Sequence, residues 1–261
     1  TAEGFWKDLE SSLHNLKTDY VDIYQFHNPA VCPKPGDGSG LYEAMLEAKE
    51  QGKIRFIGIT NHRMSIAEEA IESGLYDTLQ FPFNYLSTER EIALAKACAE
   101  HEMGFIAMKG LSGGLLTNSA AIYAYMAQFE NVLPIWGVQK ESELDEFLSY
   151  IGNPPELTDE LKAVIEKDQK ELAGEFCRGC GYCMPCPAGI EINNCARMSL
   201  LLRRSPSAGH LSPEGQAKMK KIEDCLHCGH CKSMCPYGLD TPKLLEENYK
   251  DYKEVLAGKR L

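Results

Sequence analysis

The chain has 261 residues, of which 44% are hydrophobic and 25% charged, a composition typical of globular proteins. Its 27 basic and 38 acidic residues give a net charge of −11. This charge argues against a nucleic-acid partner, because few positive charges remain to neutralise backbone phosphates. No run of about 18 apolar residues is present and the N-terminus lacks a signal-peptide core, so we expect no membrane partner and a cytoplasmic location.

Residues 1–150 alternate between short apolar runs and segments with a helical hydrophobic period. The apolar runs are rich in β-branched residues and predict strands at 20–26, 54–60, 78–83, 104–108 and 132–136. The helical segments lie at 4–16, 41–51, 65–73, 88–101, 120–129 and 141–150. Strands that are apolar on both faces and alternate with helices form parallel sheets, so we predict an α/β fold.

The spacing of the strands indicates a barrel. Each strand–helix unit takes about 25 to 35 residues, close to the roughly 31 residues per unit of a (β/α)8 TIM barrel. Five units are visible where a barrel has eight. The pattern therefore predicts either the rear part of a barrel, with three units missing, or an open sheet.

Pro154 and Pro155 mark the end of the barrel-like region. We predict a partial barrel over 1–152, a helical linker over 153–176 and a Cys-rich domain over 177–261. A helix is expected in the linker at 158–174. Helical patterns in the Cys-rich domain, which we predict to be all-α, lie at 191–203, 214–224 and 241–261.

Nine of the eleven cysteines lie between residues 177 and 235. Eight of these nine form two motifs with the spacing C-x2-C-x2-C-x2-C-P and C-x2-C-x2-C-x3-C-P. In two-cluster ferredoxins, three cysteines at this spacing hold one cluster and the cysteine before proline serves the other. We therefore predict two [4Fe–4S] clusters. One set of ligands is Cys177, Cys180, Cys183 and Cys235. The crossed set is Cys225, Cys228, Cys231 and Cys186.

Zinc is the alternative occupant, but structural zinc sites usually use two separated CxxC pairs. The first motif has one residue fewer before its last cysteine than the bacterial form, which makes Cys186 the least secure ligand. We expect Cys195 to be buried by packing rather than to bind metal. His227 and His230 are expected to face solvent or to bond sulfur, with ligation as a minor alternative.

Several stretches resemble the aldo-keto reductases, in the order of strands 4 to 8 of that family. They are LESSLHNLKTDYVDIYQFHNP, KEQGKIRFIGITNH, TLQFPFNYL, GFIAMKGLSGGLL and VLPIWGVQKESELDEFL. Residues 170–245 resemble the α-helical ferredoxin domains of multi-subunit redox enzymes. Together the two parts resemble aldo-keto reductases that carry a C-terminal 4Fe–4S domain.

The resemblance implies roles for particular residues. His27 would be the catalytic histidine that hydrogen-bonds the substrate carbonyl. Asn61 and Gln80 would hold the nicotinamide carboxamide with Thr60 beside them, and Met108 would stand where an aromatic residue stacks on the ring. The residues implied along the rest of the dinucleotide are Lys109, Leu111, Gly113, Gly114, Glu143 and Glu146.

Two departures from the family pattern matter. The catalytic Asp, Tyr and Lys come from strands 2 and 3, which this sequence lacks, and His27 alone cannot do their acid–base work. Glu143 would lie near the ribose 2′-phosphate and repel it, so NADH is expected over NADPH.

Three functions are open. The leading one is NAD(P)H-linked interconversion of a small carbonyl and its alcohol by an iron–sulfur oxidoreductase. The alternative is an electron-transfer ferredoxin on a non-catalytic barrel scaffold, and the third is an interacting subunit whose clusters only stabilise it. Because hydride carries two electrons and a cluster passes one, direct transfer would need a flavin-like splitter, which points to a flavoprotein or other redox partner.

Overall fold

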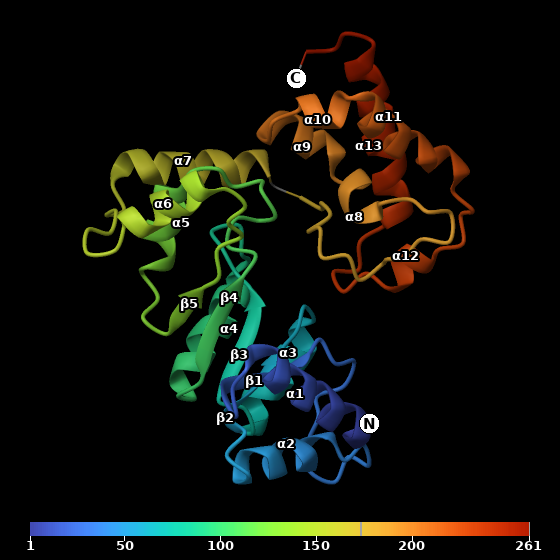
Figure 1. Cartoon of the computed structure of the whole chain (residues 1–261). Coiled ribbons are helices and arrows are strands. Elements are labelled where there is room, and N and C mark those ends of the chain that lie inside the picture. The colour runs from blue at the N-terminus through green and yellow to red at the C-terminus, as the bar shows by residue number, and fades with distance from the viewer. Residues whose placement is uncertain (173, 261) are drawn as a thin grey trace. The chain divides into compact units, whose positions relative to one another are not determined.

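Two compact units make up the chain in the computed structural model, which describes residues 1–172 and 174–260 (Figure 1). The first unit contains Thr1–Phe83, Ser87–Met108 and Met126–Ile135. The second contains Asn84–Leu86, Lys109–Tyr125 and the described residues from Trp136 onward. Parts of the predicted barrel region therefore belong with the C-terminal helices, and each unit is described by itself.

A parallel sheet forms the first unit, with its five strands in the order β1-β2-β3-β4-β5. The strands are β1 (Val21–His27), β2 (Ile54–Thr60), β3 (Thr78–Pro82), β4 (Gly104–Met108) and β5 (Val132–Pro134). Each strand pairs with its neighbours in the sequence, so that Gly58 lies opposite both Gln25 and Thr78. Parallel pairing brings all five carboxyl ends to one edge. The predicted α/β class is confirmed.

Helices pack beside these strands. They are α1 (Ala2–Leu16), α2 (Leu41–Glu50), α3 (Met64–Ser73) and α4 (Glu89–Glu100). Two of them, α1 and α4, begin at side-chain caps. The Thr1 hydroxyl accepts a hydrogen bond from the Gly4 N–H, and Thr88 and Glu91 form a reciprocal capping box at the start of α4. Each cap satisfies backbone N–H groups that the first turn leaves unpaired.

The two faces of the sheet differ in burial. On the helix-covered face the apolar side chains are fully buried, as at Ile59, Leu79 and Phe105. On the opposite face Ile23 is 39% exposed and its strand partner Phe56 is 49% exposed. Because successive residues of a strand point to opposite faces, Gln25 and His27 share this open face. The candidate catalytic histidine thus lies on the exposed side of the sheet.

Helices make up the regular structure of the second unit in the part of the chain that the structure describes. They are α5 (Ser119–Met126, whose last residue belongs to the first unit), α6 (Glu141–Ser149), α7 (Asp159–Glu171), α8 (Ile192–Cys195), α9 (Met198–Arg204), α10 (Ala208–Leu211), α11 (Pro213–Lys220), the 3-10 turn η1 (Lys221–Asp224), α12 (His230–Ser233) and α13 (Thr241–Leu256). The predicted continuous helix at 191–203 is wrong. It breaks at Ala196–Arg197 because Arg197, the N-cap of α9, leaves the helical conformation with φ of −136° and ψ of 16°.

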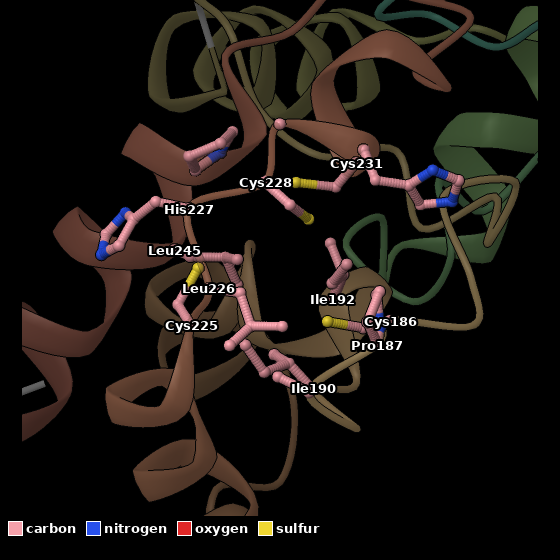
Figure 2. Close-up of a pocket in the computed structure, with 14 residues that line it drawn as sticks. Cys186, Pro187, Ile190, Ile192, Cys225, Leu226, His227, Cys228, Cys231 and Leu245 are labelled. Carbon is pink, nitrogen blue, oxygen red and sulfur yellow. The ribbon is translucent and has the colours of Figure 1, made fainter.

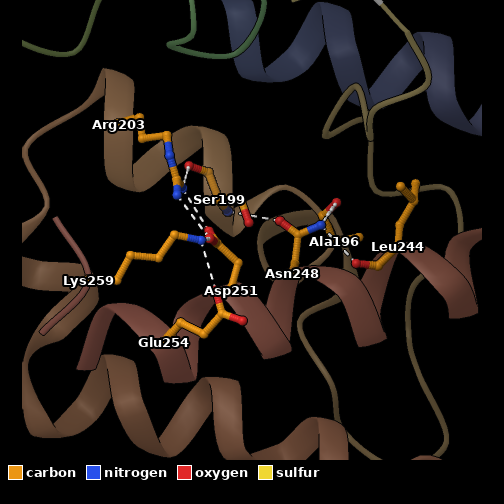
Figure 3. A network of polar contacts seen from close by, with 8 residues as sticks. All are labelled: Ala196, Ser199, Arg203, Leu244, Asn248, Asp251, Glu254 and Lys259. Carbon is orange, nitrogen blue, oxygen red and sulfur yellow. Dashed lines mark hydrogen bonds and ion pairs between the residues drawn. The ribbon is translucent and has the colours of Figure 1, made fainter. Parts of the chain in front are cut away.

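Polar side chains join α9 to α13, as Figure 3 shows. Asn248 donates to the Ala196 carbonyl and accepts from the Ser199 N–H. Arg203 makes two hydrogen bonds to the Asp251 carboxylate, at 2.7 and 2.9 Å, and Lys259 reaches the same carboxylate. The Asn248 bonds hold the turn at Arg197 against the long C-terminal helix, and the Asp251 bonds hold the other end of α9.

A buried ion pair joins α7 to α9. The Arg204 guanidinium lies 2.7 Å from the Asp168 carboxylate, which also accepts from the Tyr85 hydroxyl. Arg204 donates as well to the Leu115 carbonyl. The network therefore connects α7 and α9 to the chain that follows β4. Among residues 1–172 and 174–260, no helix has the length and hydrophobicity needed to cross a membrane.

Candidate functional site

The two Cys motifs meet around an apolar hollow in the second unit (Figure 2). Four cysteines line it: Cys186 from the first motif, and Cys225, Cys228 and Cys231 from the second. Apolar side chains fill its walls, among them Ile190, Ile192, Leu226 and Leu245. The structure therefore brings together the four cysteines that the sequence predicts for one cluster, including Cys186, the least secure of them.

Electrostatic interactions divide the cysteines in the same way. Burial raises the pKa of the Cys231 thiol, and neighbouring Cys225 and Cys186 raise it further. Burial likewise raises the pKa of Cys177, with added contributions from Cys180 and Cys235. The first group matches one predicted ligand set and the second group belongs to the other.

Cys183 lies between the two groups. Burial raises its pKa to about 12, and Cys177, Cys180 and Cys231 add to the shift. Such thiols stay protonated at neutral pH unless a metal replaces the proton, because metal binding releases protons from its ligands. The donor set is therefore one that a bound metal centre would stabilise, because the metal supplies the compensating positive charge.

Glycines shape the turns between these cysteines. Gly179, Gly181 and Gly229 have φ of 67°, 84° and 72°, in the left-handed region that favours glycine. Within the described residues no group of three or more His, Cys, Asp or Glu side chains is placed to hold a single metal ion.

The other candidate ligands differ in their surroundings. Cys195 is 1% exposed, and its thiol lies 3.9 Å from the Lys218 carbonyl. Burial raises its pKa to about 11, as expected for a cysteine held by packing. His227 and His230 are exposed and line the hollow beside the second motif.

In the first unit, the predicted nicotinamide residues lie at the carboxyl ends of adjacent strands. His27 ends β1 and is exposed, and Thr60 ends β2 and is 6% exposed. Gln80 of β3 contacts Met108 of β4, with 3.7 Å between its amide nitrogen and the sulfur. Four strands thus bring four of the predicted residues to one edge of the sheet.

Asn61 has a different environment. Its side chain is fully buried, donates to the Pro29 carbonyl and accepts from the N–H groups of His62 and Arg63. These bonds hold the turn between β2 and α3, so the Asn61 amide shapes the backbone beside Thr60.

Gln25 is a site residue that the sequence reasoning missed. Its amide donates to the Gln80 side chain at 2.9 Å, and its own carbonyl oxygen is buried with no hydrogen-bond partner among the described residues. The signal was present in the alternation of YVDIYQFH, which places Gln25 on the same face as His27.

In the second unit, the predicted pyrophosphate loop is a series of tight turns. Lys109, Gly113 and Gly114 all have positive φ, at 59°, 65° and 90°. The Gly114 N–H bonds the carbonyl of Leu111, and the Ser112 N–H bonds that of Lys109. These turns hold the loop in one conformation and use two of its N–H groups internally.

The predicted acidic residues lie on α6. The Glu143 carboxylate accepts from the N–H groups of Gln139 and Lys140, where it caps the start of the helix. Glu146 accepts from the hydroxyls of Ser119 and Tyr150, which links α6 to α5. Glu143 therefore places negative charge at the helix terminus that would otherwise attract an anion.

A second residue that the sequence reasoning missed connects this loop to the first Cys motif. The Arg197 guanidinium donates to the Gly113 carbonyl at 3.1 Å and is 8% exposed. The contact spans 84 positions of the sequence, and no local pattern predicts it.

Comparison with known proteins gives two family matches. Residues 1–131, half of the chain, match the model of the aldo/keto reductase family. Residues 176–240 match the model of a 4Fe-4S dicluster domain.

Individual relatives agree with the first match. The chain is 34% identical over 123 residues to methylglyoxal reductase DkgB of Salmonella typhimurium, covering 43% of this chain and 45% of that protein. It is 29% identical over 119 residues to an NADH-specific methylglyoxal reductase of Escherichia coli, covering 46% and 36%. The chain thus spans less than half of the length of these relatives.

Solved structures show the same fold. The aldo-keto reductase AKR11C1 of Bacillus halodurans superposes with a TM-score of 0.54 at 19% identity, covering 64% of this chain and 68% of that one. The sheet and its helices therefore have the arrangement found in that reductase.

Proposed function

Because the chain belongs to the aldo/keto reductase family and carries a 4Fe-4S dicluster domain, we propose that it is part of an iron–sulfur oxidoreductase. The reaction is the NAD(P)H-linked interconversion of a small carbonyl, such as methylglyoxal, and its alcohol. The bound nicotinamide supplies the hydride, and His27 donates a hydrogen bond to the carbonyl oxygen. The observation that carries this proposal is one parallel sheet whose strands β1, β3 and β4 carry His27, Gln80 and Met108. Barrel enzymes place their active sites at the carboxyl edge of such a sheet.

Completion of the barrel is part of the proposal. β1 is an edge strand, and Ile23 and Phe56 expose apolar surface on the open face. Three further strand–helix units would cover this face and supply the catalytic Asp, Tyr and Lys of the family. The matched segments make up only 45% and 36% of the length of the two curated relatives, which supports such an addition.

The site is tested with a protein in which the further strands are restored. We expect it to oxidise NADH in the presence of methylglyoxal. His27→Ala should lower kcat/KM by about 100-fold, the contribution of one well-placed group. His101→Ala is the matched control, since His101 is exposed at the end of α4. Equal activity of the two variants would contradict the role of His27.

The cluster ligands are proposed in the crossed sets predicted from the sequence. The hollow that contains Cys186 with Cys225, Cys228 and Cys231 supports one set. Anaerobically prepared protein should contain about eight iron and eight sulfide per chain. Zinc without sulfide would contradict both clusters.

Single serine variants separate the two sets. Cys186→Ser and Cys235→Ser should each lose about four iron, from different clusters, as distinguished by electron paramagnetic resonance of the reduced protein. Cys195→Ser, the matched control in a buried packing position, should keep about eight. Loss of the same cluster in both ligand variants would contradict the crossed assignment.

Preference for NADH is also proposed, on the charge that Glu143 places at the start of α6. The physiological electron partner would be a flavoprotein, because a flavin can accept two electrons and release them singly. Neither the reaction nor the partner requires a membrane or nucleic acid.

The second candidate is electron transfer by the clusters beside a barrel that does not catalyse. It is favoured by Asn61 and Glu146, whose polar atoms are engaged in internal hydrogen bonds. The two candidates differ in one measurement. Binding of NADH to the restored protein supports the reductase, and absence of binding supports the electron-transfer protein.

A further inference from the structure

Arg197 lies between the first Cys motif and the loop that follows β4. It begins α9, is 8% exposed, and donates from Nη1 to the Gly113 carbonyl. Its Nε is buried and has no hydrogen-bond partner among the described residues. One strong donor of the guanidinium is therefore available for an acceptor beside it.

Two glycines enclose the guanidinium. A Cβ built at Gly113 would lie 2.5 Å from Nη1, and one built at Gly179 would lie 2.7 Å from Cζ. With the guanidinium in this position neither glycine leaves room for a Cβ, so the backbone of both loops approaches the charge directly. Gly179 stands between Cys177 and Cys180, and its N–H is bonded to the Cys177 sulfur.

The guanidinium therefore places its positive charge against the backbone between Cys177 and Cys180, two of the proposed ligands of the first cluster. The same guanidinium bonds the loop through the Gly113 carbonyl.

We propose that Arg197 is a positioning residue that couples the loop at Lys109–Gly114 to the cluster held by Cys177, Cys180, Cys183 and Cys235. Through it, binding of a dinucleotide at the loop changes the reduction potential of that cluster. The ligand part of this inference rests on the proposed function, whereas the effect of Arg197 on the potential does not.

The sign follows from charge. Reduction adds one electron to the cluster, and the pyrophosphate adds negative charge at the loop. Both negative charges are stabilised by the same Arg197 guanidinium, so each weakens the stabilisation of the other. A dinucleotide should therefore bind the reduced protein more weakly than the oxidised protein. By linkage, binding of the dinucleotide lowers the reduction potential of the first cluster. The coupling free energy is the same in both directions. A nearby positive charge raises the potential of a cluster, so removal of that charge should lower it.

The first experiment compares the full, cluster-loaded chain with Arg197→Gln. Dithionite supplies the electron, and electron paramagnetic resonance reports each cluster separately. At a fixed solution potential, we expect the ratio of reduced to oxidised first cluster to be about tenfold lower in Arg197→Gln than in the wild type. This ratio corresponds to a shift of about 59 mV for a one-electron couple. The second cluster is the internal control and should not change.

Two variants separate charge from structure. Arg197→Lys keeps the charge and should keep the potential near that of the wild type. Arg203→Gln removes the same charge from the same helix at a position bonded to Asp251, and should leave both clusters unchanged. An unchanged first cluster in Arg197→Gln, or an equal shift in Arg203→Gln, would overturn the proposal.

The second experiment needs no variant. ADP-ribose serves as the probe because it has the pyrophosphate but no nicotinamide to exchange electrons. Its dissociation constant from wild-type protein should be about tenfold higher when the first cluster is reduced. Equal constants in the two states would overturn the coupling alone. Failure of ADP-ribose to bind either state would overturn the proposed function and the ligand part of the coupling together.

Discussion

Consecutive arginines on α9 allow a direct test of how burial sets the strength of an ion pair. Arg204 and its partner Asp168 have side chains only 12% and 11% exposed. Arg203 is 33% exposed, and its partner Asp251 is 16% exposed. Replacement of each arginine by methionine removes the same charge from the same helix and keeps most of the side-chain volume. The two variants therefore differ chiefly in the surroundings of the aspartate that each replacement leaves without its arginine.

The expected magnitudes follow from the partners. Arg204→Met leaves the Asp168 carboxylate buried with only the Tyr85 hydroxyl as a donor, and removes the bond to Leu115. Loss of one partner from a buried pair costs about 3–5 kcal/mol. Arg203→Met leaves Asp251 paired with Lys259, so no unpaired charge is created and a cost of about 1 kcal/mol is expected. The difference of at least about 2 kcal/mol is roughly a thirtyfold change in the unfolding equilibrium.

Thermal unfolding of the cluster-loaded protein under nitrogen, followed by circular dichroism, measures this difference. At about 2–4 °C per kcal/mol, Arg204→Met should lower the Tm by about 6–20 °C and Arg203→Met by about 2–4 °C. Adding Asp168→Asn to Arg204→Met should recover about 2 kcal/mol, because it removes the unpaired charge. Equal Tm shifts for the two arginine variants, or no recovery in the double variant, would refute the reasoning.

Three further predictions concern single positions. Gly58→Ala should lower the free energy of unfolding by about 1–3 kcal/mol, because the added Cβ would lie 2.4 Å from the Thr78 hydroxyl. Gly137→Ala is the control and should be neutral in the same unfolding assay, because open space surrounds Gly137. Burial and Glu223 raise the pKa of Tyr249 to about 12, so the stability it contributes is full below about pH 10 and lost as the pH rises through 12. Absorbance titration of wild type against Tyr249→Phe should show one such tyrosine, and a midpoint near 10 would contradict this. In the restored protein, Glu143→Gln should raise NADPH affinity relative to NADH about tenfold by fluorescence titration, and an unchanged ratio would argue against the role of Glu143.

The strands and the cysteines were the parts that the sequence specified most fully. A run such as IRFIGIT is apolar on both faces, and β2 occupies Ile54–Thr60 as predicted. The spacing of the Cys motifs groups Cys186 with Cys225, Cys228 and Cys231, and these four cysteines line one hollow, while their role as ligands stays a prediction. Both patterns are local and repeat at short intervals, so they can be recognised in a single sequence without knowledge of tertiary contacts.

Long-range polar contacts were not predictable. Arg197 bonds Gly113, and Tyr85 bonds Asp168, across 84 and 83 positions. In both cases a helix pattern with polar residues gave no reason to expect burial. The predicted helix at 191–203 failed for the same reason: its periodicity continues through Arg197, but tertiary contacts of the guanidinium favour a break there.

The coupling through Arg197 also bears on how clusters and a nicotinamide can share one protein. Hydride moves as two electrons, whereas a [4Fe–4S] cluster accepts one, so the two groups do not exchange electrons directly without a flavin. A shared guanidinium requires no electron to pass between them. Occupancy of the loop would set the potential of the first cluster, and hence the direction in which a separate one-electron partner exchanges with it. In that arrangement the clusters respond to the bound cofactor through charge, and the glycines at 113 and 179 are required because they let both loops reach the same cation.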